Sequence, residues 1–223
     1  MCDCVVTPAG NDSAVIFSPH WKSAPCQAVK RLIDGLGAGL LLIALSPLLV
    51  VLAIIVKRSS PGNIFYRWRV VGQGGRPFVS YKFRSMVSNA DDLKAKLAAS
   101  NEMTGPVFKI TNDPRVTRAG KLMRRYSLDE LPQLYSVLQG RMSLVGPRPP
   151  LASEYERFTG FQKQKLLVKP GMTGLWQVNG RNQVNDLDQW VRLDLEYIRR
   201  WSLGLDIRIL FRTVTAVLSG SGK

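Results

Sequence analysis

The feature that most constrains this chain is an uncharged apolar run from Leu36 to Val56. At about 1.5 Å of rise per residue, a straight helix over this run is roughly 30 Å long, the thickness of the hydrocarbon core of a bilayer. Length alone therefore predicts a helix that crosses a membrane. Ser46 and Pro47 fall at its centre. Because Pro47 lacks the N–H that would bond back to the carbonyl of Ile43, a straight helix here costs about 3 kcal/mol or more.

Basic residues flank the run on both sides, with Lys30 and Arg31 before it and Lys57 and Arg58 after it. Lys and Arg prefer the cytoplasmic side of a membrane, so this pattern favours a re-entrant helical hairpin with both ends on one face. The Ser46 hydroxyl is the expected partner for a backbone group freed by the break. A kinked single span and a buried helix of a soluble protein stay open as alternatives. Either membrane topology places the remaining, positively charged chain in the cytoplasm.

The net charge of +15 and the pI near 10.2 allow three classes of partner: nucleic acid, anionic lipid and phosphorylated small molecules. A basic side chain near an anionic leaflet gains about 1 kcal/mol, so membrane lipid accounts for part of the excess. The sequence has no zinc-finger, helix-turn-helix or aromatic RNA-binding pattern, which disfavours nucleic acid.

The chain has an odd number of cysteines (Cys2, Cys4 and Cys26) and a single histidine, His20. These residues form neither a disulfide framework nor a zinc site, and they indicate a reducing compartment.

We predict a helix-rich α+β fold with a single cytoplasmic domain. Residues 1–27 form a disordered tail, 28–58 the re-entrant membrane helix, 59–218 the cytoplasmic domain, and 219–223 a short tail. A β-hairpin is expected from the runs 64–68 and 78–84, which flank a glycine-rich turn at 72–75. Amphipathic helices are expected at 88–100, 120–126, 187–200 and 205–218, the last lying on the core or on the membrane surface.

Only one part of the sequence combines acidic residues, clustered arginines and rigid turns. Pro132 is tolerated only in the first turn of a helix, so a helix is expected from near Asp129 to Gly140, which places Asp129 and Glu130 at its positive end. The structural alternative is a capping box, because Ser127 precedes Glu130 by three residues. The acids therefore have either a capping or a chemical role.

The chemical alternative rests on the neighbouring arginines. Arg124 lies about one helical turn before the acids, and Arg148 is presented by a turn between two prolines. Guanidinium groups match phosphate oxygens, and vicinal carboxylates suit a hard divalent cation that also contacts phosphate. One acid can hold the metal while the other attacks phosphorus to form an acyl phosphate. The pattern favours metal-assisted chemistry on a phosphate at the membrane face.

The same residues resemble the bacterial sugar transferases, the monotopic phosphoglycosyl transferases that begin glycan assembly on polyprenyl phosphate. The resemblance covers roughly residues 28–215, and the chain resembles the small members, closest in character to those that initiate exopolysaccharide synthesis with galactosyl or glucosyl phosphate. The matching segments are Lys30-Arg31 with Asp34, Ser46-Pro47, Tyr81–Met86, Asn112–Thr117, Ser127–Leu134, Val145–Pro149 and Lys169–Trp176.

The resemblance implies transfer of hexose 1-phosphate from a UDP-hexose, with galactose or glucose as the sugar, to undecaprenyl phosphate, with release of UMP. It implies that Asp129 is the nucleophile and that Glu130 binds Mg²⁺. It also implies a re-entrant membrane helix broken at Ser46-Pro47 and a location at the bacterial inner membrane, with the catalytic domain on the cytoplasmic face. The predicted phosphate-binding residues are Arg124, Arg148, Lys82, Arg84 and Arg181.

Two other functions stay open at this stage. A non-enzymatic membrane adaptor would use the basic surface to recruit acidic partners, and it would release no UMP from a UDP-sugar. A membrane-anchored nucleic-acid binder would show steeply salt-dependent binding to any duplex. A homodimer also stays open as an alternative to a monomer.

Overall fold

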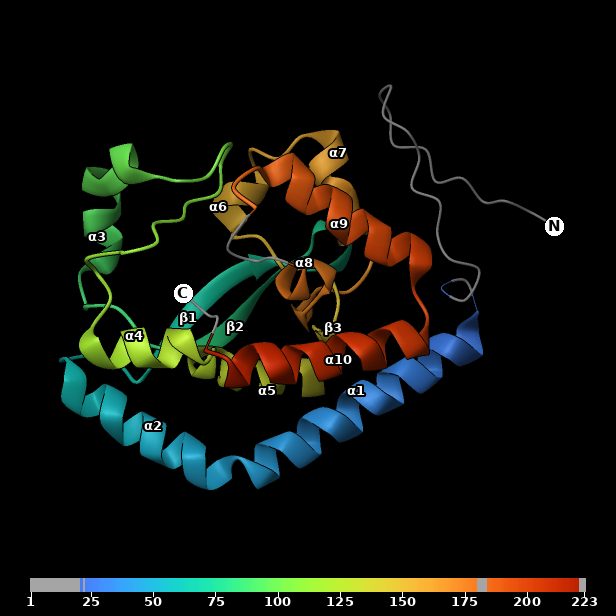
Figure 1. Cartoon of the computed structure of the whole chain (residues 1–223), viewed down its shortest axis with the longest axis horizontal. Coiled ribbons are helices and arrows are strands. Elements are labelled where there is room, and N and C mark those ends of the chain that lie inside the picture. The colour runs from blue at the N-terminus through green and yellow to red at the C-terminus, as the bar shows by residue number, and fades with distance from the viewer. Residues whose placement is uncertain (1–20, 22, 180–183, 221–223) are drawn as a thin grey trace.

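The computed structural model describes residue 21, residues 23–179 and residues 184–220. These residues form a helix-rich α+β structure (Figure 1). The α-helices are α1 (Ala24–Ala44), α2 (Ser46–Ser59), α3 (Ala90–Lys94), α4 (Arg118–Arg125), α5 (Leu134–Leu138), α6 (Ala152–Tyr155), α7 (Gly160–Lys163), α8 (Leu175–Val178), α9 (Leu187–Arg200) and α10 (Leu203–Leu218). Segments of 3₁₀ helix lie at Gln73–Gly75, Ala95–Ser100, Leu128–Gln133 and Gln164–Leu167. The strands are β1 (Phe65–Val71), β2 (Pro77–Phe83), β3 (Ser143–Val145) and β4 (Gly171–Thr173).

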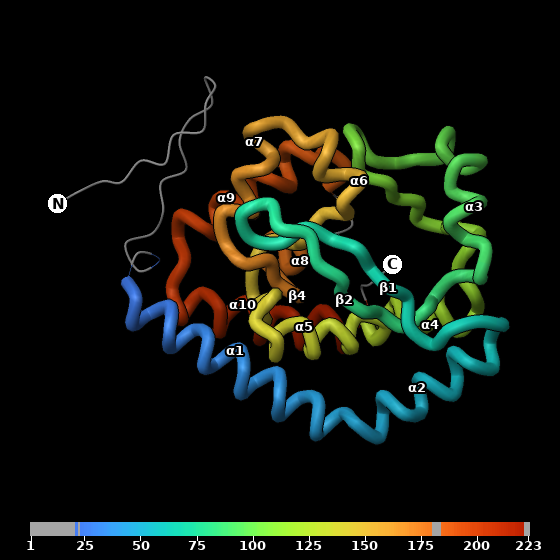
Figure 2. The backbone as a smooth tube through the Cα atoms, turned by 180° about the vertical axis from the view of Figure 1, so that it is seen from behind, coloured from blue at the N-terminus to red at the C-terminus, as the bar shows by residue number. Residues whose placement is uncertain are grey.

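Helices α1 and α2 form a wide V along one side of the molecule, seen at the bottom of Figure 1 and from behind in Figure 2. The two helices meet at the Ser46-Pro47 break with a bend of 64°. The Ser46 hydroxyl donates a hydrogen bond of 2.8 Å to the carbonyl of Ile43, the acceptor that Pro47 cannot serve. The predicted break and its predicted hydroxyl partner are therefore confirmed. In the described chain no single helix has the length and apolar character of a membrane span; only the bent pair has them when taken together.

The first half of α1 carries its charges inward and its apolar residues outward. Lys30 and Asp34 are buried, whereas Leu32 is 60% exposed. The Lys30 ammonium donates to Asp206 Oδ2 of α10 at 2.6 Å and to the carbonyl of Val145 at 3.2 Å. These buried polar contacts hold α1 to the rest of the protein. The helix also begins at Ala24, four residues before the boundary expected at residue 28.

The hairpin β1–β2 pairs in antiparallel register, with Tyr66 opposite Lys82 and Trp68 opposite Ser80. Its turn is closed by a hydrogen bond from the N–H of Gly72 to the carbonyl of Arg76, 2.8 Å. This confirms the predicted hairpin and its glycine-rich turn. Because alternate residues of a strand share a face, Tyr66, Trp68 and Lys82 lie on one face of the hairpin.

A close backbone approach fixes the turn that carries Arg148. Strands β3 and β4 are parallel, with Ser143 opposite Gly171. The N–H of Gly171 donates 2.9 Å to the carbonyl of Pro147, and a Cβ on Gly171 would overlap the backbone of Gly146. Glycine is therefore required for the two segments to meet.

The acidic pair lies in a 3₁₀ segment, Leu128–Gln133, and not in the first turn of an α-helix that reaches Gly140. Ser127 has a left-handed conformation, with φ of +53°, and its side chain makes no capping hydrogen bond. The expected α-helix is confirmed only over Leu134–Leu138. The capping box that was the structural alternative is wrong, because Ser127 is left-handed and its side chain makes no capping bond. The expected helix 88–100 is likewise divided into α3 and a 3₁₀ segment, whereas 187–200 is confirmed as α9 and 205–218 falls within α10.

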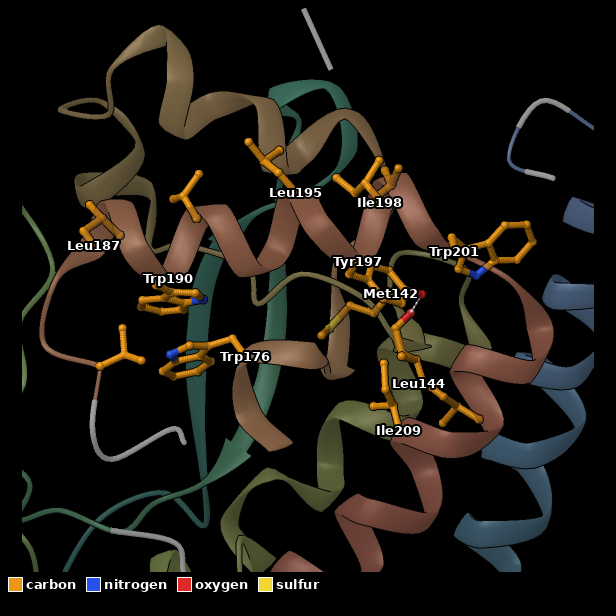
Figure 3. Close-up of a cluster of buried hydrophobic side chains, with 14 of the residues drawn as sticks. Met142, Leu144, Trp176, Leu187, Trp190, Leu195, Tyr197, Ile198, Trp201 and Ile209 are labelled. Atoms are coloured by element: carbon orange, nitrogen blue, oxygen red, sulfur yellow. Dashed lines mark hydrogen bonds between the residues drawn. The ribbon is translucent and has the colours of Figure 1, made fainter. Parts of the chain in front are cut away.

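Two hydrophobic clusters hold these elements together. The larger lies between β3, α8, α9 and α10, where the Trp176 and Trp190 rings stack with centroids 4.1 Å apart (Figure 3). The smaller joins α2, β2 and α4 through the buried residues Leu52, Val56, Phe83 and Met123, with Leu128 and Leu131 packed against it. The smaller cluster thus connects the end of α2 to the segment that carries the acidic pair.

Gly120 permits α4 to lie directly against the end of β2. A Cβ at this position would overlap the carbonyl oxygen of Ser85. We predict that Gly120→Ala lowers the free energy of unfolding by about 1–3 kcal/mol, the usual cost of overpacking, measured as a lower melting temperature in detergent. Gly204→Ala is the matched control, because a Cβ there meets only the Ser202 hydroxyl at 3.9 Å. Equal stability of the two variants would contradict the close approach.

Candidate active site

A cavity of about 380 Å³ opens between the hairpin, the acidic segment and the Arg148 turn. Its walls include Lys82 of β2, Arg124 of α4, Asp129 and Glu130 of the 3₁₀ segment, and Arg148. The structure therefore brings together most of the residues that the sequence predicts for phosphate chemistry. Both acids are largely buried, each with 8% of its surface exposed.

Two cations bind the same oxygen of Glu130. The Lys82 ammonium donates to Glu130 Oε1 at 2.8 Å, and the Arg148 guanidinium donates to this atom at 3.1 Å. Both pairs are largely shielded from water, so they are screened less by salt than surface pairs. The pairs fix the side chain of Glu130, and they place two positive charges beside the neighbouring Asp129.

The indole ring of Trp68 packs against these two cations. The Lys82 ammonium lies 3.7 Å from the centroid of the indole, and the Arg148 guanidinium carbon lies 5.4 Å from it. Both distances lie within the range of a cation–π interaction. Trp68 is buried. Its position follows from the hairpin register, because Trp68 is the diagonal neighbour of Lys82.

Burial changes the acid–base properties of the cationic groups. The pKa of Lys82 falls to about 8, mainly because burial penalises its charged form; Glu130 opposes this effect and Arg148 adds to it. Burial also lowers the pKa of Arg124, although the nearby carboxylate of Asp129 acts in the opposite direction. Partly desolvated cations of this kind gain from the arrival of an anion, so the cavity is suited to phosphate groups.

Arg124 is held in place by Ser85, whose hydroxyl accepts a 2.9 Å hydrogen bond from the guanidinium Nε. Arg84 is differently placed. It lines the cavity, but its Nη2 donates to the carbonyl of Ser60 at 2.6 Å and to that of Val56 at 3.4 Å. Arg84 therefore ties β2 to the end of α2.

The remaining predicted residues lie elsewhere. Ser46 and Pro47 form the bend of the V and are not part of the cavity wall. Arg181 lies outside the described residues.

Sequence reasoning missed several residues of the cavity wall. They include Tyr66 and Trp68 on β1, Ser88 and Asp91 before and within α3, and Lys94, Phe108 and Glu154. The two aromatic residues on β1 were detectable from the predicted hairpin, because they share a face with Lys82. The helical pattern expected at 88–100 does not indicate which of its residues face the site, and no local pattern places Phe108 there.

The acidic pair has the donor set for a hard divalent cation. Magnesium usually takes one or two protein carboxylates and completes its shell with water and phosphate oxygens. The described residues contain no group of three or more His, Cys, Asp or Glu side chains that could hold a metal ion. The carboxylate of Glu130, with that of Asp129 next to it, matches the number of carboxylates that magnesium takes from a protein.

Comparison with known proteins gives independent evidence on the chain as a whole. The family model described as bacterial sugar transferase matches residues 26–220. The undecaprenyl-phosphate galactose phosphotransferase of Salmonella typhimurium is 45% identical over 198 residues, which cover 87% of this chain and 41% of the relative. The UDP-glucose:undecaprenyl-phosphate glucose-1-phosphate transferase of Xanthomonas campestris is 44% identical over 196 residues, which cover 85% of this chain and 38% of the relative.

A shorter relative is matched over most of both chains. The exopolysaccharide production protein ExoY of Sinorhizobium fredii is 43% identical over 198 residues, 87% of this chain and 87% of the relative. By contrast, the chain spans less than half the length of several other curated relatives that it matches.

Proposed function

This chain belongs to the bacterial sugar transferase family, and from that premise we propose that it transfers hexose 1-phosphate from a UDP-hexose to undecaprenyl phosphate. Galactose or glucose is the proposed sugar, in line with the names of its relatives. The product begins a repeat unit of an exopolysaccharide. The observation that carries the proposal is the placement of Asp129 next to Glu130, which two half-buried cations hold, in a cavity lined by further basic residues.

The proposed reaction has two steps. In the first, a carboxylate oxygen of Asp129 attacks the phosphorus that carries the hexose, an Asp129 O–P bond forms, and the bond between this phosphorus and the bridging oxygen breaks. UMP leaves with that oxygen. In the second step, a phosphate oxygen of undecaprenyl phosphate attacks the same phosphorus and releases the Asp129 carboxylate. The products are UMP and a hexosyl diphosphate lipid, so atoms and charges balance.

The other residues of the site bind and orient the donor. Arg148, Lys82 and Arg124 surround the acids and neutralise the diphosphate, which otherwise repels a carboxylate nucleophile. Glu130 is the residue that would hold Mg²⁺, and the ion when bound supplies additional positive charge to the phosphate oxygens. Glu130 Oε1 accepts hydrogen bonds from both Lys82 and Arg148, and these bonds fix the orientation of the carboxylate.

The acceptor is a lipid, and the apolar surface of the protein fits a site at the membrane. On the V, Leu40 and Ile43 are 68% and 74% exposed. On α10, Phe211 and Leu218 are 71% and 75% exposed and lie on one helix face with Ile207 and Val214. We propose that the V enters one leaflet as a re-entrant hairpin and that α10 lies at the lipid boundary. The cavity then faces the cytoplasm beside the inner membrane.

A basic membrane adaptor remains the alternative function. It accounts for the net charge and the apolar V, but it does not require two acids in a cationic cavity. Incubation of the purified protein with Mg²⁺, labelled UDP-hexoses and polyprenyl phosphate separates the two, because only the enzyme releases UMP.

Replacement of the proposed nucleophile tests the first step. We predict that Asp129→Asn lowers the rate of hexose-phosphate transfer by about 10³-fold or more, because an amide oxygen does not replace a carboxylate nucleophile. The rate of UMP release in the presence of acceptor is the measurement. Asp188→Asn, an exposed change of the same type on α9, is the control. Substantial activity in Asp129→Asn would overturn the assignment.

The role of Glu130 is tested by a magnesium titration. In Glu130→Gln the side chain keeps its shape and loses its charge, so we expect a higher magnesium concentration for half-maximal activity, together with a turnover lower by about tenfold or more. An unchanged magnesium titration would contradict a metal-binding role, whatever the effect on turnover.

The re-entrant topology predicts that both ends of the V lie on the same side of the membrane. In a variant whose native cysteines are replaced by serine, either Ser23→Cys or Ser59→Cys introduces a single thiol at one end. Both thiols should resist a membrane-impermeant maleimide in intact cells and react after permeabilisation. Labelling of only one of them in intact cells would show a true membrane span.

A further inference from the structure

Glu154 adds to the cavity a carboxyl group that is separate from the acidic pair. This carboxyl lines the cavity with only 8% of its residue surface exposed. Its Oε2 accepts a 3.0 Å hydrogen bond from the backbone N–H of Leu151, which closes the first turn of α6. Among the described residues Oε1 has no hydrogen-bond donor, and Glu154 forms no salt bridge. The capping bond therefore accounts for one carboxyl oxygen and leaves the other for a ligand.

The electrostatic setting of Glu154 differs from that of Glu130. Burial raises its pKa, and the more distant charges of Lys94, Arg148 and Lys165 only partly oppose this rise. An ionised carboxylate repels phosphate and accepts hydrogen bonds, so within a phosphorylated donor it is suited to a neutral group that offers an O–H or N–H. Such groups are found in a UDP-hexose on both sides of the diphosphate, as sugar hydroxyls and as the imide N–H of uracil.

Arg148 interacts with both the acidic pair and the carboxyl group of Glu154. Its guanidinium donates to Glu130 Oε1, and its charge also acts on Glu154. Arg148, the acidic pair and Glu154 line the same cavity, so a diphosphate bound by Arg148 lies in the cavity that also holds Glu154. Because the cations hold the charged diphosphate, the uncharged parts of the donor are the parts available to Glu154.

We propose that Glu154 determines donor specificity, with Oε1 accepting a hydrogen bond from a hexose hydroxyl or from the imide N–H of the uracil ring. This inference rests on the proposed function, since it assigns a contact to the UDP-hexose donor. It adds to the phosphate contacts a residue that recognises the neutral part of the substrate.

The Glu154→Gln variant separates recognition from helix capping. The amide oxygen of glutamine can still accept the Leu151 N–H, whereas its NH₂ group cannot accept a hydrogen bond from the donor. We expect the KM for UDP-hexose to rise about tenfold or more, as for the loss of a hydrogen bond to a charged group, with a smaller change in kcat. The KM does not depend on the folded fraction of the sample, so partial unfolding does not imitate the result. Glu156→Gln, an exposed change near the end of the same helix, is the matched control and should leave the KM unchanged.

Inhibition by UMP identifies the group that is bound. UMP carries the base without the hexose, so weaker UMP inhibition of Glu154→Gln assigns the contact to uracil. Unchanged UMP inhibition, combined with a raised KM and an altered ratio of kcat/KM for UDP-galactose and UDP-glucose, assigns it to the sugar. An unchanged donor KM in Glu154→Gln would overturn this inference alone. Absence of UMP release by the unmodified protein would instead overturn the proposed function.

Discussion

The site depends on one carboxylate oxygen, Glu130 Oε1, which accepts hydrogen bonds from both Lys82 and Arg148. These partners come from a β-strand and from a proline-bounded turn, so the two ion pairs join separate parts of the chain. Trp68 backs both cations and removes them from water, which strengthens their interaction with the carboxylate. Removal of either Lys82 or Arg148 leaves the buried charge of Glu130 only partly paired. The position of Asp129, the next residue in the chain, depends on the same two ion pairs.

A second buried network attaches the apolar V to the rest of the protein. Lys30 of α1 pairs with Asp206 of α10, and the hydroxyl of Tyr197 and the indole N–H of Trp201 donate to the same carboxyl group. The backbone N–H of Leu144 adds a bond to Asp34. With its charges used inside the protein, α1 presents an apolar surface outward. A helix of this kind is suited to lipid, and the polar network holds it against α10 and β3.

The sequence was most informative where the pattern is local. The β1–β2 hairpin, α9 and the break at Ser46-Pro47 all follow from nearest neighbours and were predicted with small errors in their ends. The conformation of the acidic segment was not predictable, because it depends on the left-handed Ser127 between two helical elements. The burial of Lys30 was also missed, since its partner Asp206 lies 176 residues away. Residues 129, 130, 124, 148 and 82 were identified from motifs, but their arrangement around Trp68 required the tertiary structure.

The proposed mechanism requires Asp129 to accept the phosphosugar before the lipid acceptor takes part. The most direct measurement is therefore the stoichiometry of UMP release when the purified protein is mixed with Mg²⁺ and UDP-hexose in the absence of polyprenyl phosphate. The two-step account predicts a rapid burst that approaches one UMP per active protein molecule, followed by full turnover once acceptor is added. Strict dependence of even the first UMP on acceptor would contradict the account and would indicate direct transfer between the two substrates.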